Sequence, residues 1–166
     1  MSASKKSGTD PGAKPTIGWR EWVALPDLGV DFIKAKVDTG ARTSALHAFD
    51  LHEVVRDGLV HVRFVIHPVQ RKSDPSVEVE LPLLTRRRVR DSGGRSELRP
   101  VVVTPVEVCG RRWPIEITLT RRDTMGFRML LGRQAIRGRF VVDPGASFFS
   151  RKPRKKKRTP KERNRS

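Results

Sequence analysis

The stretch Ile33-Lys34-Ala35-Lys36-Val37-Asp38-Thr39-Gly40-Ala41 decides the fold of this chain, together with a second stretch, Met129-Leu130-Leu131-Gly132-Arg133. The first stretch alternates apolar and polar residues, which predicts a half-buried β-strand that runs into a tight turn. The second is an apolar run that ends in Gly-Arg and continues into a short helix-forming stretch, Gln134-Ala135-Ile136. The chain therefore delivers one carboxylate, that of Asp38, into a turn at the end of a strand.

Two interpretations of this turn are open. Asp-Thr-Gly is an ordinary turn sequence, because Asp side chains bond to nearby backbone and Gly accepts a positive φ. It also resembles half of an aspartic peptidase site, in which Gly40 would let backbone N–H groups approach the Asp38 carboxylate without a Cβ in the way. Such an enzyme holds two carboxylates around one water, and the pair shares a proton because like charges at that distance do not both ionise. One chain supplies one such aspartate, so this chemistry needs a second aspartate, from a second copy or from a different partner chain.

The order of the two stretches resembles that of the retropepsins, the aspartic proteases of retroviral type. The resemblance narrows to one bacterial and archaeal retropepsin-like family, usually labelled ATP-dependent zinc protease. The segments that carry it span about Ile17 to Phe149 and are 17–26, 34–47, 91–94 and 114–120.

This resemblance implies an all-β fold, a closed β-barrel with a flap hairpin and one short C-terminal helix. It implies a homodimeric aspartic endopeptidase in which Asp38, Thr39 and Gly40 of each chain form the catalytic site, Thr39 bonding across the dimer axis. Leu131, Gly132 and Arg133 would be structural, with Arg133 placed where retropepsins have an arginine that pairs with an aspartate. Asp123 is a candidate for such a partner. Because family members are similar to, or found with, ATP-grasp ligases that append glutamate to proteins, the resemblance also implies glutamate-rich or glutamylated protein substrates.

The segment from Arg86 to Arg99 is the candidate flap. Its Gly-Gly tip lies between two extended arms, as a hairpin that opens and closes over a substrate requires. Five arginines flank the tip, and guanidinium groups lining a cleft would select carboxylate-rich substrates. The alternative is an exposed hairpin whose charges only keep an edge strand soluble. The predicted substrate-binding residues are Ala41, Arg42, Arg90, Ser92, Gly93 and Gly94.

No cofactor is predicted. The chain has a single cysteine, Cys109, lacks a His-Glu-x-x-His sequence and has no phosphate-binding loop of the G-x-x-x-x-G-K-[ST] type. Its histidines lie on separate segments, although two of them share one predicted strand, which leaves a metal-dependent hydrolase as a remote alternative. The four histidines are His47, His52, His61 and His67.

Charge divides the chain into three parts. The formal net charge is +17, of which residues 151–166 carry ten Lys or Arg and one Glu. We expect residues 1–16 to be a disordered lead-in, 17–150 to form the peptidase domain, and 151–166 to be a disordered basic tail. The tail is either an electrostatic arm for non-specific nucleic-acid contact or a solubilising terminus with no dedicated partner, because composition does not separate the two. As an electrostatic arm, it supports a different hypothesis, a catalytically silent basic binding module for RNA, a ribosome or an acidic protein.

The remaining expectations concern location and secondary structure. No apolar run approaches the length needed to cross a bilayer and the N-terminal residues do not form a signal peptide, which predicts a cytoplasmic protein without membrane contact. Turn residues are expected at 26–29 and 109–110. Apolar and polar alternation, together with turn residues, predicts strands over 19–25, 32–37, 44–49, 60–67, 77–81, 99–108 and 112–120. Residues 133–136 are predicted to form one short helix.

Overall fold

The computed structural model describes residues 12–70, 72–91, 93–121 and 126–151. Within these ranges the secondary structure is almost entirely β, as predicted. The helix is α1 (Arg133–Ile136), and a 3₁₀ helix at Pro26–Leu28 occupies the expected turn. The strands are β1 (Thr16–Ile17), β2 (Arg20–Leu25), β3 (Val30–Asp38), β4 (Ser44–His47), β5 (Phe49–Arg56), β6 (Leu59–Ile66), β7 (Val77–Pro82), β8 (Thr85–Arg90), β9 (Ser96–Val108), β10 (Arg111–Thr120), β11 (Met129–Gly132) and β12 (Val141–Val142).

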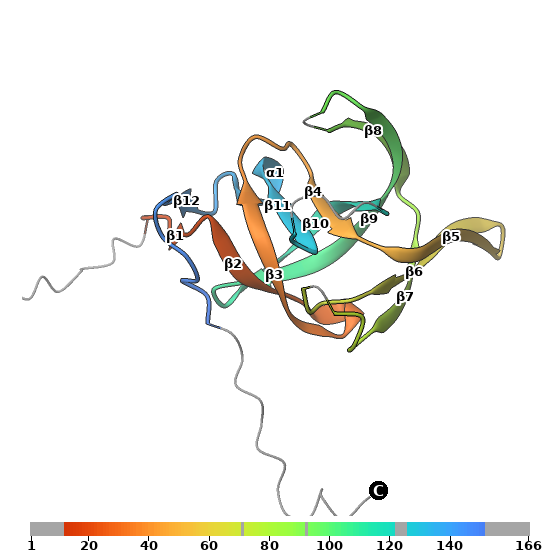
Figure 1. The fold of residues 1–166 in the computed structure, drawn as a ribbon, viewed down its shortest axis with the longest axis horizontal. Coiled ribbons are helices and arrows are strands. Elements are labelled where there is room, and N and C mark those ends of the chain that lie inside the picture. Colours follow the sequence, from red (N-terminus) through yellow and green to blue (C-terminus); the bar gives the residue numbers. More distant parts are fainter. Residues whose placement is uncertain (1–11, 71, 92, 122–125, 152–166) are drawn as a thin grey trace, which may run out of the picture.

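Seven of the strands form the main sheet, in the order β10-β4-β11-β3-β2-β9-β8, and β9 also pairs with β10. The extra pairing closes six of these strands into a ring, which confirms the predicted barrel (Figure 1). The seventh strand, β8, pairs with the end of β9 that extends beyond the ring. Among the described residues, no helix is long and apolar enough to span a membrane.

The barrel interior is filled by the strand faces that the alternation predicts. On β3 the side chains of Ile33, Ala35 and Val37 are buried, while those of Lys34 and Lys36 are only half-buried. Because side chains alternate across a strand, the side chain of Asp38, the last residue of β3, lies on the face opposite that of Val37.

A second sheet, β5-β6-β7, stands beside the barrel (Figure 1). Val62, Phe64 and Ile66 of β6 are buried toward the barrel, as the predicted alternation requires. The expected strand at 44–49 is instead divided: β4 ends at His47 and β5 continues separately to Arg56. Sequence pattern did not reveal β5 beyond residue 49, because the strand is mostly exposed on both faces and carries no clean alternation.

One carboxylate is completely buried in the barrel wall. Glu21 on β2 accepts hydrogen bonds from the backbone N–H groups of Gly18 (2.7 Å), Phe149 (2.9 Å) and Ser150 (2.8 Å), and from the Ser150 hydroxyl. Buried carboxylates are tolerated only when their oxygens are satisfied in this way. Glu21 therefore fastens residues 149–150 to the barrel.

Candidate active site

The Asp38 carboxylate lies at the end of β3, half-buried, on the loop that connects β3 to β4. Its Oδ1 atom accepts hydrogen bonds from the backbone N–H groups of Gly40 (3.0 Å) and Ala41 (3.2 Å). A Cβ on Gly40 would lie 3.3 Å from that oxygen, tighter than a normal contact. The close approach of backbone N–H groups expected for Gly40 is therefore present, and it holds the carboxylate in one orientation.

The two stretches on which the sequence analysis rests meet in space. Strand β11 lies between β3 and β4, parallel to β3, with Leu131 opposite Val37 and Gly132 opposite Asp38. The loop from residue 39 to 43 must therefore pass over the end of β11 to reach β4. It passes so closely that a Cβ on Gly132 would lie 2.5 Å from the carbonyl carbon of Thr43. Gly132 is needed at this position because only a residue without a side chain leaves room for the loop.

Hydrogen bonds fasten the loop to the start of α1. The N–H of Arg133 donates to the carbonyl oxygen of Ala41 (2.7 Å), and the N–H of Gln134 donates to that of Arg42 (3.0 Å). The Arg133 guanidinium also donates to the carbonyl oxygen of Thr39 (3.1 Å). Arg133 thus braces the Asp38 loop of its own chain. Its expected aspartate partner, Asp123, lies outside the described residues.

The predicted flap is a β-hairpin formed by β8 and the first half of β9, which projects from the barrel (Figure 1). Asp91 closes its turn: its N–H donates to the Arg95 carbonyl (2.9 Å), and its Oδ1 accepts from the Arg95 N–H (2.9 Å). Gly94 has a φ of +83°, a conformation that favours glycine. Gly93 and Gly94 are exposed at the tip as predicted, whereas Ser92 lies outside the described residues.

The arginines of the flap do not all face one cleft. Alternation along β8 places Arg86, Arg88 and Arg90 on one face and Arg87 on the other. Arg86 donates to both carboxylate oxygens of Glu53 on β5, at distances from 2.6 to 2.9 Å. The hydrogen bond from Arg86 lowers the pKa of Glu53. Arg88 and Arg90 are exposed, so the predicted substrate-binding residue Arg90 lies on the opposite face from Arg87.

Sequence reasoning counted Arg87 only as one of five flanking arginines, yet Arg87 contacts the Asp38 loop. Its guanidinium donates to the hydroxyl of Thr43 (3.3 Å) and to the carboxylate of Glu116 on β10 (3.1 Å). The partners are 44 and 29 residues away in sequence, so no local pattern could reveal them. The signal available in the sequence is the alternation along β8, which places the Arg87 side chain on the opposite face from those of Arg86 and Arg88.

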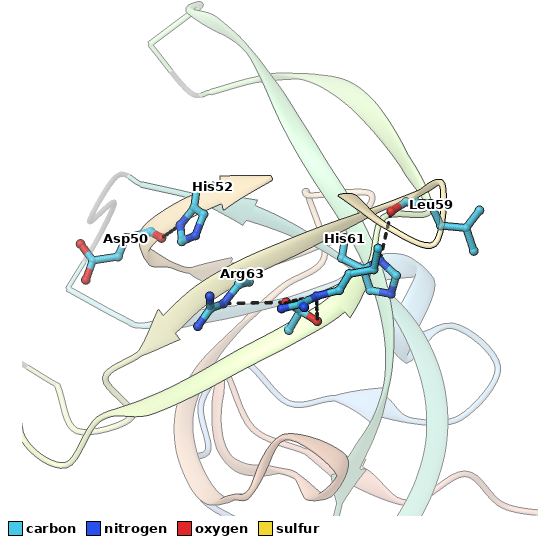
Figure 2. A network of polar contacts seen from close by, with 7 residues as sticks. Asp50, His52, Leu59, His61 and Arg63 are labelled. Carbon is cyan, nitrogen blue, oxygen red and sulfur yellow. Dashed lines mark hydrogen bonds and ion pairs between the residues drawn. The ribbon is translucent and has the colours of Figure 1, made fainter. Parts of the chain in front are cut away.

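The histidines lie in two places: the rings of His47 and His67 both pack against Phe49, and His52 and His61 lie on β5 and β6 of the second sheet. On the outer face of the second sheet, Nδ1 of His52 donates to the Asp50 carbonyl and Nδ1 of His61 to the Leu59 carbonyl (Figure 2). His67 lies beyond the end of β6 with its ring against Phe49, at 4.1 Å between centroids. Six residues of extended chain cover about 20 Å, so His61 and His67 do not share one ion. Across the described ranges, no group of three or more His, Cys, Asp or Glu side chains is placed to hold a metal.

A closed β-barrel, an Asp-Thr-Gly loop that crosses a Gly-Arg strand end, and a projecting hairpin together define a retropepsin-like domain. Comparison with family models agrees. The RimB-like model, described as retropepsin-like aspartic endopeptidase RimB, matches residues 16–153, and the chain belongs to this family.

The chain is also similar to parts of longer proteins. It is 45% identical over 132 residues to a protein of Shewanella pealeana named "Probable alpha-L-glutamate ligase", covering 80% of this chain and 29% of that protein. A protein of the same name from Parasynechococcus marenigrum is 46% identical over 134 residues, with 81% and 29% covered. The chain thus spans less than a third of the length of these curated relatives. A crystal structure of a Legionella pneumophila protein of unknown function matches with a TM-score of 0.68 and 26% identity, over 84% of this chain and 100% of that one.

Proposed function

We propose that the chain is an aspartic peptidase that acts as a homodimer and hydrolyses glutamate-rich or glutamylated protein substrates. The observation that carries the proposal is the Asp38 carboxylate, held by the N–H groups of Gly40 and Ala41 on a loop that crosses Gly132. An ordinary turn would need neither the crossing nor the bond from Arg133 to the Thr39 carbonyl. Membership of a retropepsin-like endopeptidase family supports the same proposal.

The chemistry follows from pairing two such loops. Each chain contains one Asp-Thr-Gly sequence, and a two-fold axis between two chains would bring the two Asp38 carboxylates together. The pair would share one proton, since two adjacent carboxylates do not both ionise. The ionised member takes a proton from a water molecule, which attacks the scissile carbonyl, while the protonated member polarises the carbonyl oxygen. The N–H groups of Gly40 and Ala41 would keep each carboxylate oriented throughout.

Two observations support an acidic substrate. The flap carries the exposed Arg95 beside its tip, and arginine recognises carboxylates through paired hydrogen bonds. The curated relatives are named for joining glutamate, and this chain matches under a third of their length. A hydrolase that removes glutamate would act on the same class of substrate as a ligase that adds it.

The first test compares wild type with Asp38→Asn on a protein with a poly-glutamate tail and on a neutral peptide. Asp143→Asn is the matched control, because the Asp143 carboxylate also accepts from the N–H of a glycine two residues later, Gly145 (2.9 Å), in a turn elsewhere. We expect Asp38→Asn to abolish cleavage of the acidic substrate and Asp143→Asn to retain it. Cleavage should persist in a metal chelator and should occur only in the dimer fraction.

The dimer itself is tested by mixing. An excess of Asp38→Asn chains added to a fixed amount of wild type should lower its activity, because mixed dimers hold only one functional carboxylate. Full activity of Asp38→Asn, or a monomer that cleaves, would refute the aspartic mechanism. A monomer that cleaves neither substrate but binds RNA or an acidic protein would instead support the basic binding module.

A further inference from the structure

We propose that Arg87 is a positioning residue that fixes the Asp38 loop from the base of the flap. Its relevance to catalysis rests on the proposed function, but the contact itself is a property of the fold. Arg87 lies on β8, whereas the loop belongs to the β3–β4 connection on the barrel. The contact therefore joins the flap hairpin to the Asp38 loop of the barrel.

The guanidinium of Arg87 is held in one orientation by its hydrogen-bond partners. Its guanidinium donates to both the Thr43 hydroxyl (3.3 Å) and the Glu116 carboxylate (3.1 Å). Glu116 receives bonds from both terminal nitrogens of Arg87, which holds the planar guanidinium in one orientation and balances its charge. The side chains of Arg87 and Glu116 are 35% and 39% exposed, so water screens the pair in part. The role assigned to Arg87 is accordingly orientation of Thr43 rather than stability of the barrel.

Thr43 is the residue whose position governs the loop. It lies directly against Gly132, where its backbone leaves no space for a Cβ. The residues before it are held by α1, through the N–H groups of Arg133 and Gln134. The Thr43 hydroxyl accepts the hydrogen bond by which the Arg87 side chain of the flap contacts the loop. A shift of Thr43 away from β11 would loosen the bonds to α1 and, through them, the turn that orients Asp38.

Arg86 and Arg87, at the base of the flap, bind to different parts of the molecule. Arg86 holds one face of β8 to Glu53 on the second sheet, and Arg87 holds the other face to the Asp38 loop. Toward the tip, Arg88 and Arg90 are exposed and have no ion pair with any described residue. The base of the hairpin is therefore held on both of its faces, by Arg86 on one and by Arg87 on the other.

The test measures amide hydrogen exchange by NMR at Arg133 and Gln134, whose N–H groups donate to the loop, alongside kcat and KM for the acidic substrate. Arg87→Ala and Thr43→Val each remove the contact, the second without changing the side-chain volume. Arg86→Ala is the matched control, since it removes a neighbouring arginine with an equivalent carboxylate partner on the opposite face.

We expect about tenfold faster exchange at both amides in Arg87→Ala and in Thr43→Val, because a hydrogen bond from a charged donor is lost. The double variant should exchange no faster than either single variant, since both remove one contact. Cleavage should show kcat lowered about tenfold with KM changed less than twofold, as for loss of positioning rather than of substrate binding. Arg86→Ala should leave exchange at both amides unchanged.

Three results would overturn the proposal: unchanged exchange in Arg87→Ala, equally faster exchange at core amides such as that of Ile33, or a raised KM with kcat unchanged. The exchange measurement does not depend on activity. If wild type cleaves nothing while exchange responds as expected, the proposed function fails and the positioning role of Arg87 stands.

Discussion

Replacing Gly132 with alanine tests the loop crossing on which the candidate site depends. The added Cβ would lie 2.5 Å from the carbonyl carbon of Thr43, and 2.7 Å from both its oxygen and the nitrogen of Ser44. All three are backbone atoms, so no side-chain rotation relieves the overlap. Gly132 has φ −83° and ψ 169°, a conformation that alanine adopts freely, so the effect is purely steric.

The magnitude follows from those distances. Overpacking by one methyl group in a close-packed interior costs roughly 1–3 kcal/mol, and the upper end applies where backbone must move. Displacing the loop also strains the bonds from the N–H groups of Arg133 and Gln134 to its carbonyl oxygens. We therefore expect a loss of about 3 kcal/mol in the free energy of unfolding, which lowers the urea midpoint by at least about 1 M.

The assay is urea unfolding followed by tryptophan fluorescence, with cleavage of the acidic substrate measured in parallel. Gly145→Ala is the matched control: the nearest atom to its added Cβ would be a side-chain oxygen at 3.4 Å, an ordinary contact. The control should stay within about 0.5 kcal/mol of wild type. If Gly132→Ala is as stable and as active as Gly145→Ala, the loop does not cross β11 as described and the reasoning fails.

Two further predictions concern buried and exposed carboxylates. Glu21→Ala should lose about 3 kcal/mol or more by scanning calorimetry, because it removes the acceptor of the buried N–H groups of Gly18 and Ser150 and of the part-buried N–H of Phe149. Glu107→Ala, which removes a surface partner of Arg112, should lose at most about 1 kcal/mol. The lowered pKa of Glu53 means that its pairing with Arg86 stabilises the fold at pH values above 4.5, and that this contribution disappears as the pH falls through the lower folded-state pKa. The difference in urea midpoint between wild type and Arg86→Ala should therefore be present at pH 7 and vanish in acid; a difference that persists in acid would contradict the pairing.

Local patterns predicted much of the fold. Alternation over residues 60–67 and 77–81 correctly indicated strands with one buried face, because a strand beside a core must place its apolar side chains with a period of two. The Gly-Gly segment correctly indicated a hairpin turn, and the run from Arg133 to Ile136 a single turn of helix. Strand β5 was missed beyond its first residue because neither of its faces is continuously buried.

The sequence by itself placed Asp38, Thr39 and Gly40 in a turn after an alternating strand, because the alternation ends there and Asp and Gly favour turns. It also indicated that Leu131 and Gly132 belong with that turn, through the resemblance of their order to that of retropepsins. Only the tertiary structure decided why Gly132 must be glycine: β11 inserts between β3 and β4, and the loop passes over it.

The contacts of Arg87 and Glu21 could not be predicted from the sequence either. Periodicity reports which face of an element is buried, since burial repeats with the element's own geometry. A contact between side chains many residues apart leaves no such period. The bond from Arg87 to Thr43 and the burial of Glu21 against Ser150 depend on how distant strands and segments are brought together, which is settled only when the barrel closes.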